Sequence, residues 1–207
     1  MSIRLASNAA SAPSIASSTW PAIALDGPRA GVLATRLAQL MGLHDRPQGV
    51  RVDRALVGSV ITAAARAGLA EDLAARPDAA EPSDETTLAF LEALRQSPRP
   101  AAEVSQLAEI LGYASLGQMV GASEPSLRRY ASGLRQTPDR IALRLHFVTQ
   151  IVAILRGSFN EFGIRRWFER AHPALDGRAP ATVLRGDFDP ADPSAQATLD
   201  AAARLLW

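Results

Sequence analysis

An apolar stretch in the second half of the chain constrains the fold more than any other feature. Residues 137–155 read TPDRIALRLHFVTQIVAIL. Their apolar residues fall on most sides of a helix: Ile141, Leu145, Val148, Ile151, Val152 and Leu155. Thr137 is the expected N-cap and Pro138 the expected first helical residue, because both types favour those positions. A helix with so little polar surface must be surrounded, so we predict that it lies at the centre of the core.

The rest of the chain also carries its apolar residues at helical spacing, and no stretch reads convincingly as a strand. Aromatic residues make up only 5% of the chain, which favours packing of alanine- and leucine-rich helices over sandwiches or barrels. We therefore predict an all-α fold. Ser158 and Glu161 fit a capping box that opens one helix. Further helices are expected over residues 29–42, 51–68, 85–96, 101–112, 180–186 and 193–207.

Breaks rich in proline divide the chain into four segments. Residues 1–28 are rich in alanine and serine and lack periodicity, so we expect a mobile tail. Residues 29–97 form a helical region to which the sequence assigns no role. Residues 98–156 contain two short helices followed by the long apolar helix. Residues 157–207 form a small helical domain at the C-terminal end.

Composition excludes several classes of site. The chain has no cysteine, which rules out disulfides, a thiol nucleophile and cysteine-based zinc binding. Its three histidines (His44, His146 and His172) are too few and too scattered for a metal cluster, and we expect no cofactor. The first residues lack the apolar core of a signal peptide, and no apolar run approaches the ~18 residues that span a bilayer. We expect a cytoplasmic protein.

The net charge of +1 excludes a uniformly basic surface, so any contact with DNA must come from a local patch. One stretch fits a helix-turn-helix: residues 117–133, GQMVGASEPSLRRYASG. Gly117 supplies the small residue where two helices cross, and Gly121 supplies the turn. Ser123 is the expected cap of the second helix, and Pro125 falls in its first turn. The expected buried residues are Leu116, Val120, Leu127 and Tyr130.

The remaining side chains of the second helix point outward in this interpretation: Ser123, Glu124, Pro125, Arg128, Arg129 and Ser132. This is the face that such a motif lays in the major groove, where arginine reads guanine or contacts phosphate. The alternative is a pair of core helices joined by a tight turn, with the two arginines on a solvated face. Glu124 favours that alternative, because a carboxylate repels phosphate.

The C-terminal segment contains a spaced pattern of aromatic, proline and glycine residues: Trp167, Phe168, Pro173, Leu175, Gly177, Pro180 and Leu184. It resembles the toxin-binding domain of the Xre/MbcA/ParS antitoxin family, and residues 133–155 resemble the long helix that joins an Xre-like helix-turn-helix to that domain. The resemblance covers about residues 100–207, whereas residues 1–95 have no counterpart. The pattern residues themselves are expected to pack a small core and to fix turns.

The resemblance implies a type II antitoxin. Its partner would be a RES-domain toxin that degrades NAD, which the antitoxin would mask, and together with the toxin it would repress its own operon. We expect the binding residues on the exposed edge of the domain and in the last helix: Arg178, Arg185, Asp187, Leu205 and Trp207. Trp207 would insert into the partner or fold back onto its own domain, and the sequence does not separate these two.

Two other functional classes fit the sequence less well. A free-standing Xre-type regulator would use the C-terminal domain only to dimerise. An enzyme is disfavoured, because no nucleophile stands at a recognisable spacing from His172, Glu161 or Glu169. We also expect a homodimer, since palindromic operators require paired units and the apolar helix up to Leu155 carries more apolar surface than one small domain covers.

Overall fold

The computed structural model describes residues 25–45 and 51–206, and within them it contains eleven α-helices, one short 3-10 helix and no strand. The predicted all-α fold is confirmed. The first four helices are α1 (Gly27–Leu40), α2 (Arg54–Arg66), α3 (Glu71–Ala74) and α4 (Asp84–Arg95). The next four are α5 (Pro100–Leu111), α6 (Tyr113–Val120), α7 (Glu124–Ala131) and α8 (Asp139–Leu155). The last elements are α9 (Glu161–Glu169), η1 (Pro173–Leu175), α10 (Pro180–Val183) and α11 (Pro193–Ala203).

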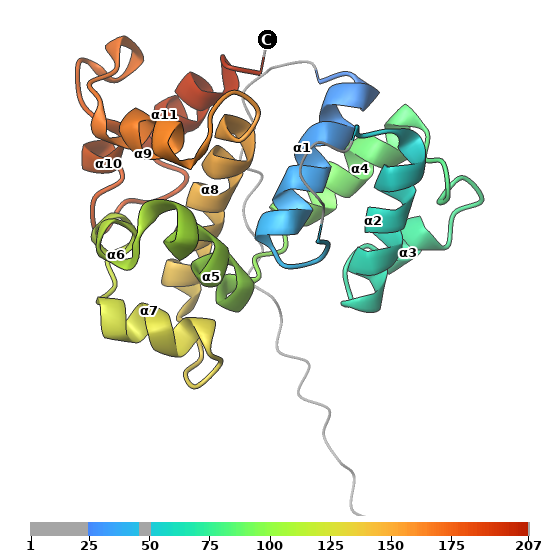
Figure 1. Cartoon of the computed structure of the whole chain (residues 1–207), viewed down its shortest axis with the longest axis horizontal. Helices are drawn as coiled ribbons and strands as arrows, with labels where there is room; N and C mark the ends of the chain where they lie inside the picture. The colour runs from blue at the N-terminus through green and yellow to red at the C-terminus, as the bar shows by residue number, and fades with distance from the viewer. Residues whose placement is uncertain (1–24, 46–50, 207) are drawn as a thin grey trace, which may run out of the picture.

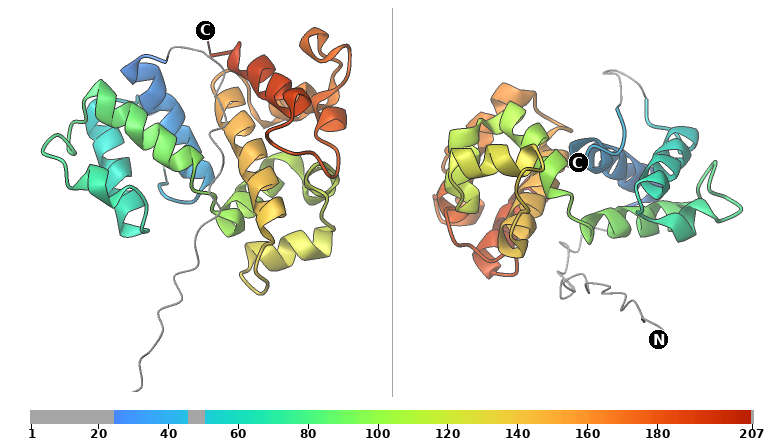
Figure 2. Two further views of the ribbon diagram at one scale, coloured as in Figure 1. Left: turned by 180° about the vertical axis from the view of Figure 1, so that it is seen from behind. Right: turned by 90° about the horizontal axis from the view of Figure 1, so that it is seen from below.

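The helices form two groups that lie side by side, α1–α4 and α5–α11 (Figures 1 and 2). Helix α8 runs through the second group and packs against α1 of the first, as well as against α5, α6 and α11. Thirteen of its seventeen residues are buried, which confirms the predicted central helix. The α5–α11 group does not cover α8 alone, because α1 of the first group also packs against it. This agrees with the expectation that the helix carries more apolar surface than one small domain covers, and the expected homodimer stays a prediction.

Two predicted helix starts also need correction. Helix α8 begins at Asp139 with Pro138 as N-cap, so Thr137 does not cap it. Helix α9 is capped by Asn160, whose side-chain oxygen accepts a hydrogen bond from the Gly163 N–H at 2.9 Å. Ser158 is unsuited to that role, because its own N–H still bonds to the Leu155 carbonyl in the last turn of α8. The next polar residue therefore becomes the cap.

The first helix begins close to the position that the sequence predicts. Asp26 caps α1 by accepting a hydrogen bond from the Arg29 N–H, and the helix starts at Gly27, two residues earlier than predicted. The rest of that tail, residues 1–24, lies outside the described residues.

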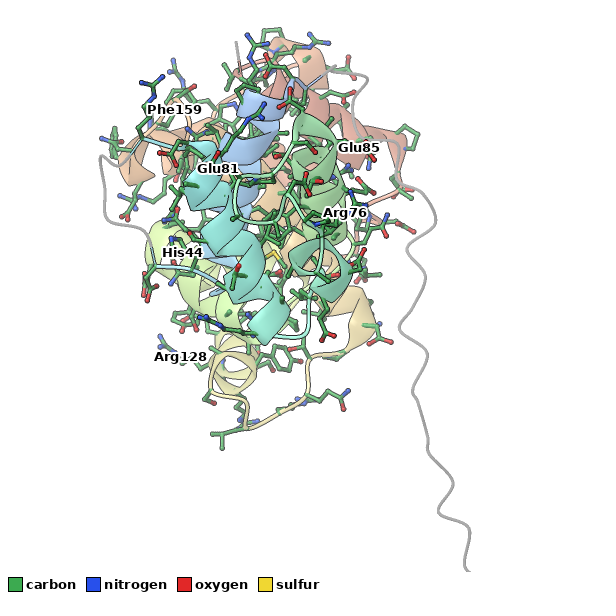
Figure 3. All side chains as sticks on the ribbon, turned by 90° about the vertical axis from the view of Figure 1, so that its right-hand side faces the viewer. His44, Arg76, Glu81, Glu85, Arg128 and Phe159 are labelled. Atoms are coloured by element: carbon green, nitrogen blue, oxygen red, sulfur yellow. The ribbon has the colours of Figure 1, made fainter. Side chains whose placement is uncertain are left out.

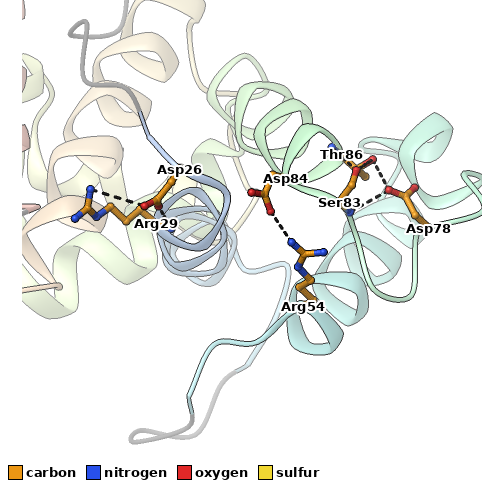
Figure 4. Close-up of polar contacts among 7 residues, drawn as sticks. All are labelled: Asp26, Arg29, Arg54, Asp78, Ser83, Asp84 and Thr86. Carbon is orange, nitrogen blue, oxygen red and sulfur yellow. Dashed lines mark hydrogen bonds and ion pairs between the residues drawn. The ribbon is translucent and has the colours of Figure 1, made fainter.

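Acidic side chains organise the α1–α4 group (Figure 4). Asp84 at the start of α4 pairs with Arg54 at the start of α2, at 2.8 Å. Asp78 lies in the connection between α3 and α4, where it accepts hydrogen bonds from the Ser83 N–H and the Thr86 hydroxyl. The Ser83 backbone bond, followed by the Ser83 and Thr86 side chains, lowers the pKa of Asp78 to about 2. The carboxylate thereby ties the connection to the first turn of α4.

A buried polar pair joins the two groups. The His146 ring in α8 places Nδ1 2.7 Å from a carboxylate oxygen of Glu103 in α5, and Nε2 2.9 Å from the Arg95 carbonyl at the end of α4. A carbonyl only accepts, so Nε2 carries a proton, and a second proton lies between Nδ1 and the carboxylate. Glu103 and His146 are both buried, and the bond from His146 to the Arg95 carbonyl fixes the end of α4 against α8 in the interior.

Candidate nucleic-acid interface and partner surface

Helices α6 and α7 meet at a tight turn, as the sequence predicts. Gly121 ends α6 with φ +73°, in the left-handed region where a side chain would be strained. Gly117 lies where the two helices approach, since a Cβ at this position would come 2.5 Å from the Ala122 carbonyl oxygen. A glycine at both positions is therefore required by the backbone.

The start and the inner face of α7 also agree with the prediction. The Ser123 hydroxyl accepts a hydrogen bond from the Ser126 N–H at 3.4 Å, and Pro125 occupies the first turn. The predicted apolar residues are all buried: Leu116, Val120, Leu127 and Tyr130. Helix α7 packs against α5 and α6, and the side with Leu127 and Tyr130 is buried, so its opposite side faces outward.

The six residues predicted to face DNA are all exposed: Ser123, Glu124, Pro125, Arg128, Arg129 and Ser132. Helix α7 lies at the lower edge of the molecule in Figure 1, and Arg128 projects from that edge in Figure 3. The Arg128 guanidinium lies 4.0 Å from the centre of the Tyr113 ring, a cation–π contact that the sequence analysis missed. Arg128 is nevertheless exposed, so its guanidinium also reaches solvent.

The charge around α7 is locally basic. Residues 121–140 contain four arginines, which are all exposed, and two acidic residues, Glu124 and Asp139. Arg135 in the following turn lies over the ring of Tyr130, at 5.9 Å from its centre. A protein with a net charge of +1 thus concentrates positive charge at one edge. Such a patch attracts polyanions without making the whole surface basic.

The loop Arg185–Phe188, which follows α10, contacts the end of α6. The Gly186 N–H donates to the carbonyls of Gln118 at 2.9 Å and Met119 at 3.1 Å. The backbones approach so closely that a Cβ at Gly121 would lie 2.8 Å from the Gly186 oxygen. The loop therefore lies directly against the turn that leads into α7.

Arg144 of α8 completes this junction. Its Nε donates to the Phe188 carbonyl at 2.7 Å, and one of its terminal nitrogens lies 3.0 Å from the Asp187 carboxylate and 3.4 Å from the Val120 carbonyl. The Arg144 side chain is 10% exposed, whereas that of Asp187 is 90% exposed. The sequence gives a signal for this residue that was not used: Arg144 lies among apolar residues in the interior of the helix, away from Arg140 near its start, and a charged residue in such a place needs polar partners.

The residues of the C-terminal pattern form a small core and its turns, as expected. The buried members are Trp167, Phe168, Leu175, Pro180 and Leu184, whereas Pro173 and Gly177 are exposed in the connections. Gly177 has φ +75°. His172 caps η1, because its Nδ1 accepts a hydrogen bond from the Ala174 N–H at 3.3 Å. The indole N–H of Trp167 is buried without a hydrogen-bond partner.

The residues predicted to contact a toxin do not gather at one place. Arg178, Arg185 and Asp187 are exposed, and Asp187 belongs to the α6 junction. Leu205 is half-buried and packs against the core, and its carbonyl accepts a hydrogen bond from Ser158 at 3.1 Å. It lines a groove of about 390 Å³ that α1 and the α8–α9 connection complete. Trp207 lies outside the described residues.

The described part of the chain offers neither a metal site nor a membrane-spanning helix. Residues 25–45 and 51–206 contain no group of three or more histidine or acidic side chains that could hold a metal ion. Among the helices of these residues, none has both the length and the apolar character needed to cross a membrane. The exposed edge around α7 and the loop Arg185–Phe188 are therefore the features on which a functional argument rests. Compared with known proteins, the chain matches no protein family, no curated protein and no solved structure.

Proposed function

We propose that this chain is a DNA-binding antitoxin of a type II toxin–antitoxin system, which binds DNA through α7 and a RES-type toxin through its C-terminal segment. The observation that carries the proposal is the α6–α7 pair. One side of α7 is anchored by Leu127 and Tyr130, and the other presents Arg128 and Arg129 at an edge of the molecule. This is the arrangement that a helix needs in order to enter the major groove.

The electrostatics support the same conclusion. The four arginines of residues 121–140 outnumber the two acidic residues, and Arg128 is held in place by Tyr113. Contacts with phosphate position a protein on DNA, and arginine suits them because its guanidinium offers several N–H donors. Glu124 lies at the first position of α7, where it also stabilises the positive end of the helix, so its presence has a structural reason.

The toxin-binding half of the proposal rests on the resemblance of residues 157–207 to the antitoxin family. Five of the seven pattern residues are buried, while Arg178, Arg185 and Asp187 lie on the surface, where a partner protein has access to them. A free-standing regulator that uses its C-terminal segment only to dimerise remains the second candidate. Both candidates share DNA binding and a homodimer on a palindromic operator.

DNA binding is tested by titrating the protein against DNA from upstream of its own coding region. Replacing Arg128 and Arg129 with alanine is expected to weaken binding and to reduce the salt dependence of the affinity by about two phosphate contacts. The matched control is Arg66→Ala/Arg204→Ala, which removes the same charge from exposed positions on α2 and just after α11. Equal affinities of the two double variants would contradict the role of α7.

The toxin is tested independently of DNA. If a RES-domain enzyme is encoded beside this chain, co-expression of the chain is expected to restore growth of cells that produce the enzyme. The Arg128→Ala/Arg129→Ala variant is expected to restore growth equally well, because α7 lies outside the predicted toxin surface. Absence of a complex between the two purified proteins would favour the free-standing regulator.

A further inference from the structure

The loop Arg185–Phe188 connects two surfaces that the sequence treats as separate, the predicted partner surface and α7. We infer that this loop controls the position of α7, so that a partner protein which binds Asp187 through a basic side chain changes the affinity of α7 for DNA. This inference rests on the proposed DNA binding of α7. It adds a link between the two binding events that neither helix pair nor loop provides alone.

The C-terminal end of α6 depends on this loop for its hydrogen bonds. The last carbonyls of a helix have no partner within the helix and must be satisfied from outside. The turn itself satisfies Gly117, whose carbonyl accepts from the N–H groups of Gly121 and Ala122. The other three of the last four carbonyls of α6 are bonded by residues outside the helix. Gly186 binds those of Gln118 and Met119, and Arg144 binds that of Val120.

Arg144 couples the loop to the end of α6. The same guanidinium bonds to the Phe188 carbonyl, the Asp187 carboxylate and the Val120 carbonyl. A movement of the loop therefore changes the contacts of Arg144 with α6 as well. Because the turn between α6 and α7 is only three residues long, a displaced α6 end also displaces Ser123 and α7.

The Arg144–Asp187 pair is accessible from one side. Arg144 is buried, and a buried positive charge is stable only beside a negative one, which Asp187 supplies. Asp187 is itself largely exposed and therefore open to a partner. A lysine or arginine on a partner protein would compete with Arg144 for this carboxylate. Linkage then requires that DNA on α7 and the partner on Asp187 alter each other's affinity by the same factor.

The experiment replaces the partner by a substitution that breaks the same contact. Asp187→Ala removes the carboxylate from an exposed loop and is expected to leave the fold intact. Its matched control is Glu169→Ala, which removes one negative charge from an exposed position at the end of α9. Affinity for DNA from upstream of the coding region is measured for both variants at one salt concentration. Backbone amide shifts of the free proteins are recorded in parallel.

The direction of the change separates the inference from simple electrostatics. Loss of a carboxylate by itself strengthens binding to phosphate, as Glu169→Ala will show. Displacement of α7 weakens it, and we expect Asp187→Ala to bind about fivefold more weakly than the control. In the free protein, we expect the amide shifts of Gly121, Ala122 and Ser123 to change in Asp187→Ala and to stay unchanged in the control.

Two results would overturn the inference. If the unaltered protein binds DNA and Asp187→Ala binds as tightly as Glu169→Ala, the link fails while the proposed function stands. If the amide shifts of residues 121–123 are the same in both variants, the mechanical connection is absent. Failure of the unaltered protein to bind DNA would instead remove the proposed function of α7, and the inference with it. Arg144→Lys, which keeps the charge but loses the forked contacts, is expected to reproduce the amide changes.

Discussion

Helices α7 and α8 follow each other along the chain but differ in how much of their surface is buried. In α7 the buried residues are Leu127 and Tyr130, and the arginines lie outside. In α8 thirteen of the seventeen residues are buried, and one of its two arginines, Arg144, is itself buried and bonds to the connection after α10. The difference indicates that α8 contributes mainly to stability, whereas α7 leaves its arginines available for the DNA binding that we propose. Substitutions in the two helices should therefore act on different measurements.

The largest effect is expected from the polar pair that α8 buries. His146→Leu leaves the Glu103 carboxylate inside the protein without its main partner, and one of its oxygens already lacks a hydrogen bond. We expect a loss of about 3–5 kcal/mol in the free energy of unfolding, measured in urea. For Arg129→Ala in α7, the change should stay within about 0.5 kcal/mol, as is usual for surface positions.

The double variant Glu103→Leu/His146→Leu serves as the control for that experiment. It removes both polar groups, and replacement of a complete buried pair by apolar residues is often neutral. The double variant should therefore be more stable than His146→Leu alone. The opposite order would show that the single substitution acts through packing and not through an uncompensated charge.

A smaller effect is expected on the α7 side, at the stacked arginine. Tyr113→Leu removes the ring beneath Arg128, and the loss of a cation–π contact at a surface is worth about 0.5–1 kcal/mol. We expect DNA affinity to fall by roughly twofold to fivefold in a direct titration. Tyr113→Phe keeps the ring and should bind like the unaltered protein. Equal affinities of the Leu and Phe variants would remove Tyr113 as a positioning residue.

The smallest effect lies outside both helices, in the α1–α4 group, and depends on pH. Hydrogen bonds from Ser83 and Thr86 lower the pKa of Asp78 from 3.8 to about 2 in the folded protein. A lowered folded-state pKa stabilises the protein above the unfolded value, and this contribution disappears as the pH falls from about 4 to about 2. In thermal melts, Asp78→Asn should therefore be less stable than the unaltered protein at pH 5, with a smaller difference at pH 2. A difference that stays constant over this range would show that the carboxylate contributes nothing through its charge.

The sequence predicts the parts of this molecule that depend on neighbours in the chain. Periodic apolar residues locate α8, and a glycine followed by a serine locates the turn and cap before α7. Ser158 misled the prediction because the turn after α8 still binds its N–H to the Leu155 carbonyl, and how far such turns continue depends on the surroundings of the helix. Local patterns do not contain such information.

The polar contacts of the candidate site could not be predicted in the same way. Arg144 and Asp187 stand 43 residues apart, as do Glu103 and His146, and only the packing of α5, α8 and the last loop brings each pair together. The sequence does show that a charged residue within an apolar helix requires a partner. It does not identify the partner among many acidic residues. The same limit applies to Arg128, which finds its aromatic ring on α6 and not within α7.

The packing of α1 against α8 has a consequence for how the protein is made. Helix α1 ends at Leu40 and α8 at Leu155, so 115 residues separate the synthesis of the two faces. At a translation rate of about 5–20 residues per second, α1 is complete roughly 6–23 s before α8 is complete. During that interval α4 can cover one side of α1, while the side that will meet α8 stays exposed to water and to other nascent chains. The α1–α4 group therefore depends on the later half of the protein to finish its own surface, and an interrupted chain would present an apolar face that chaperones recognise.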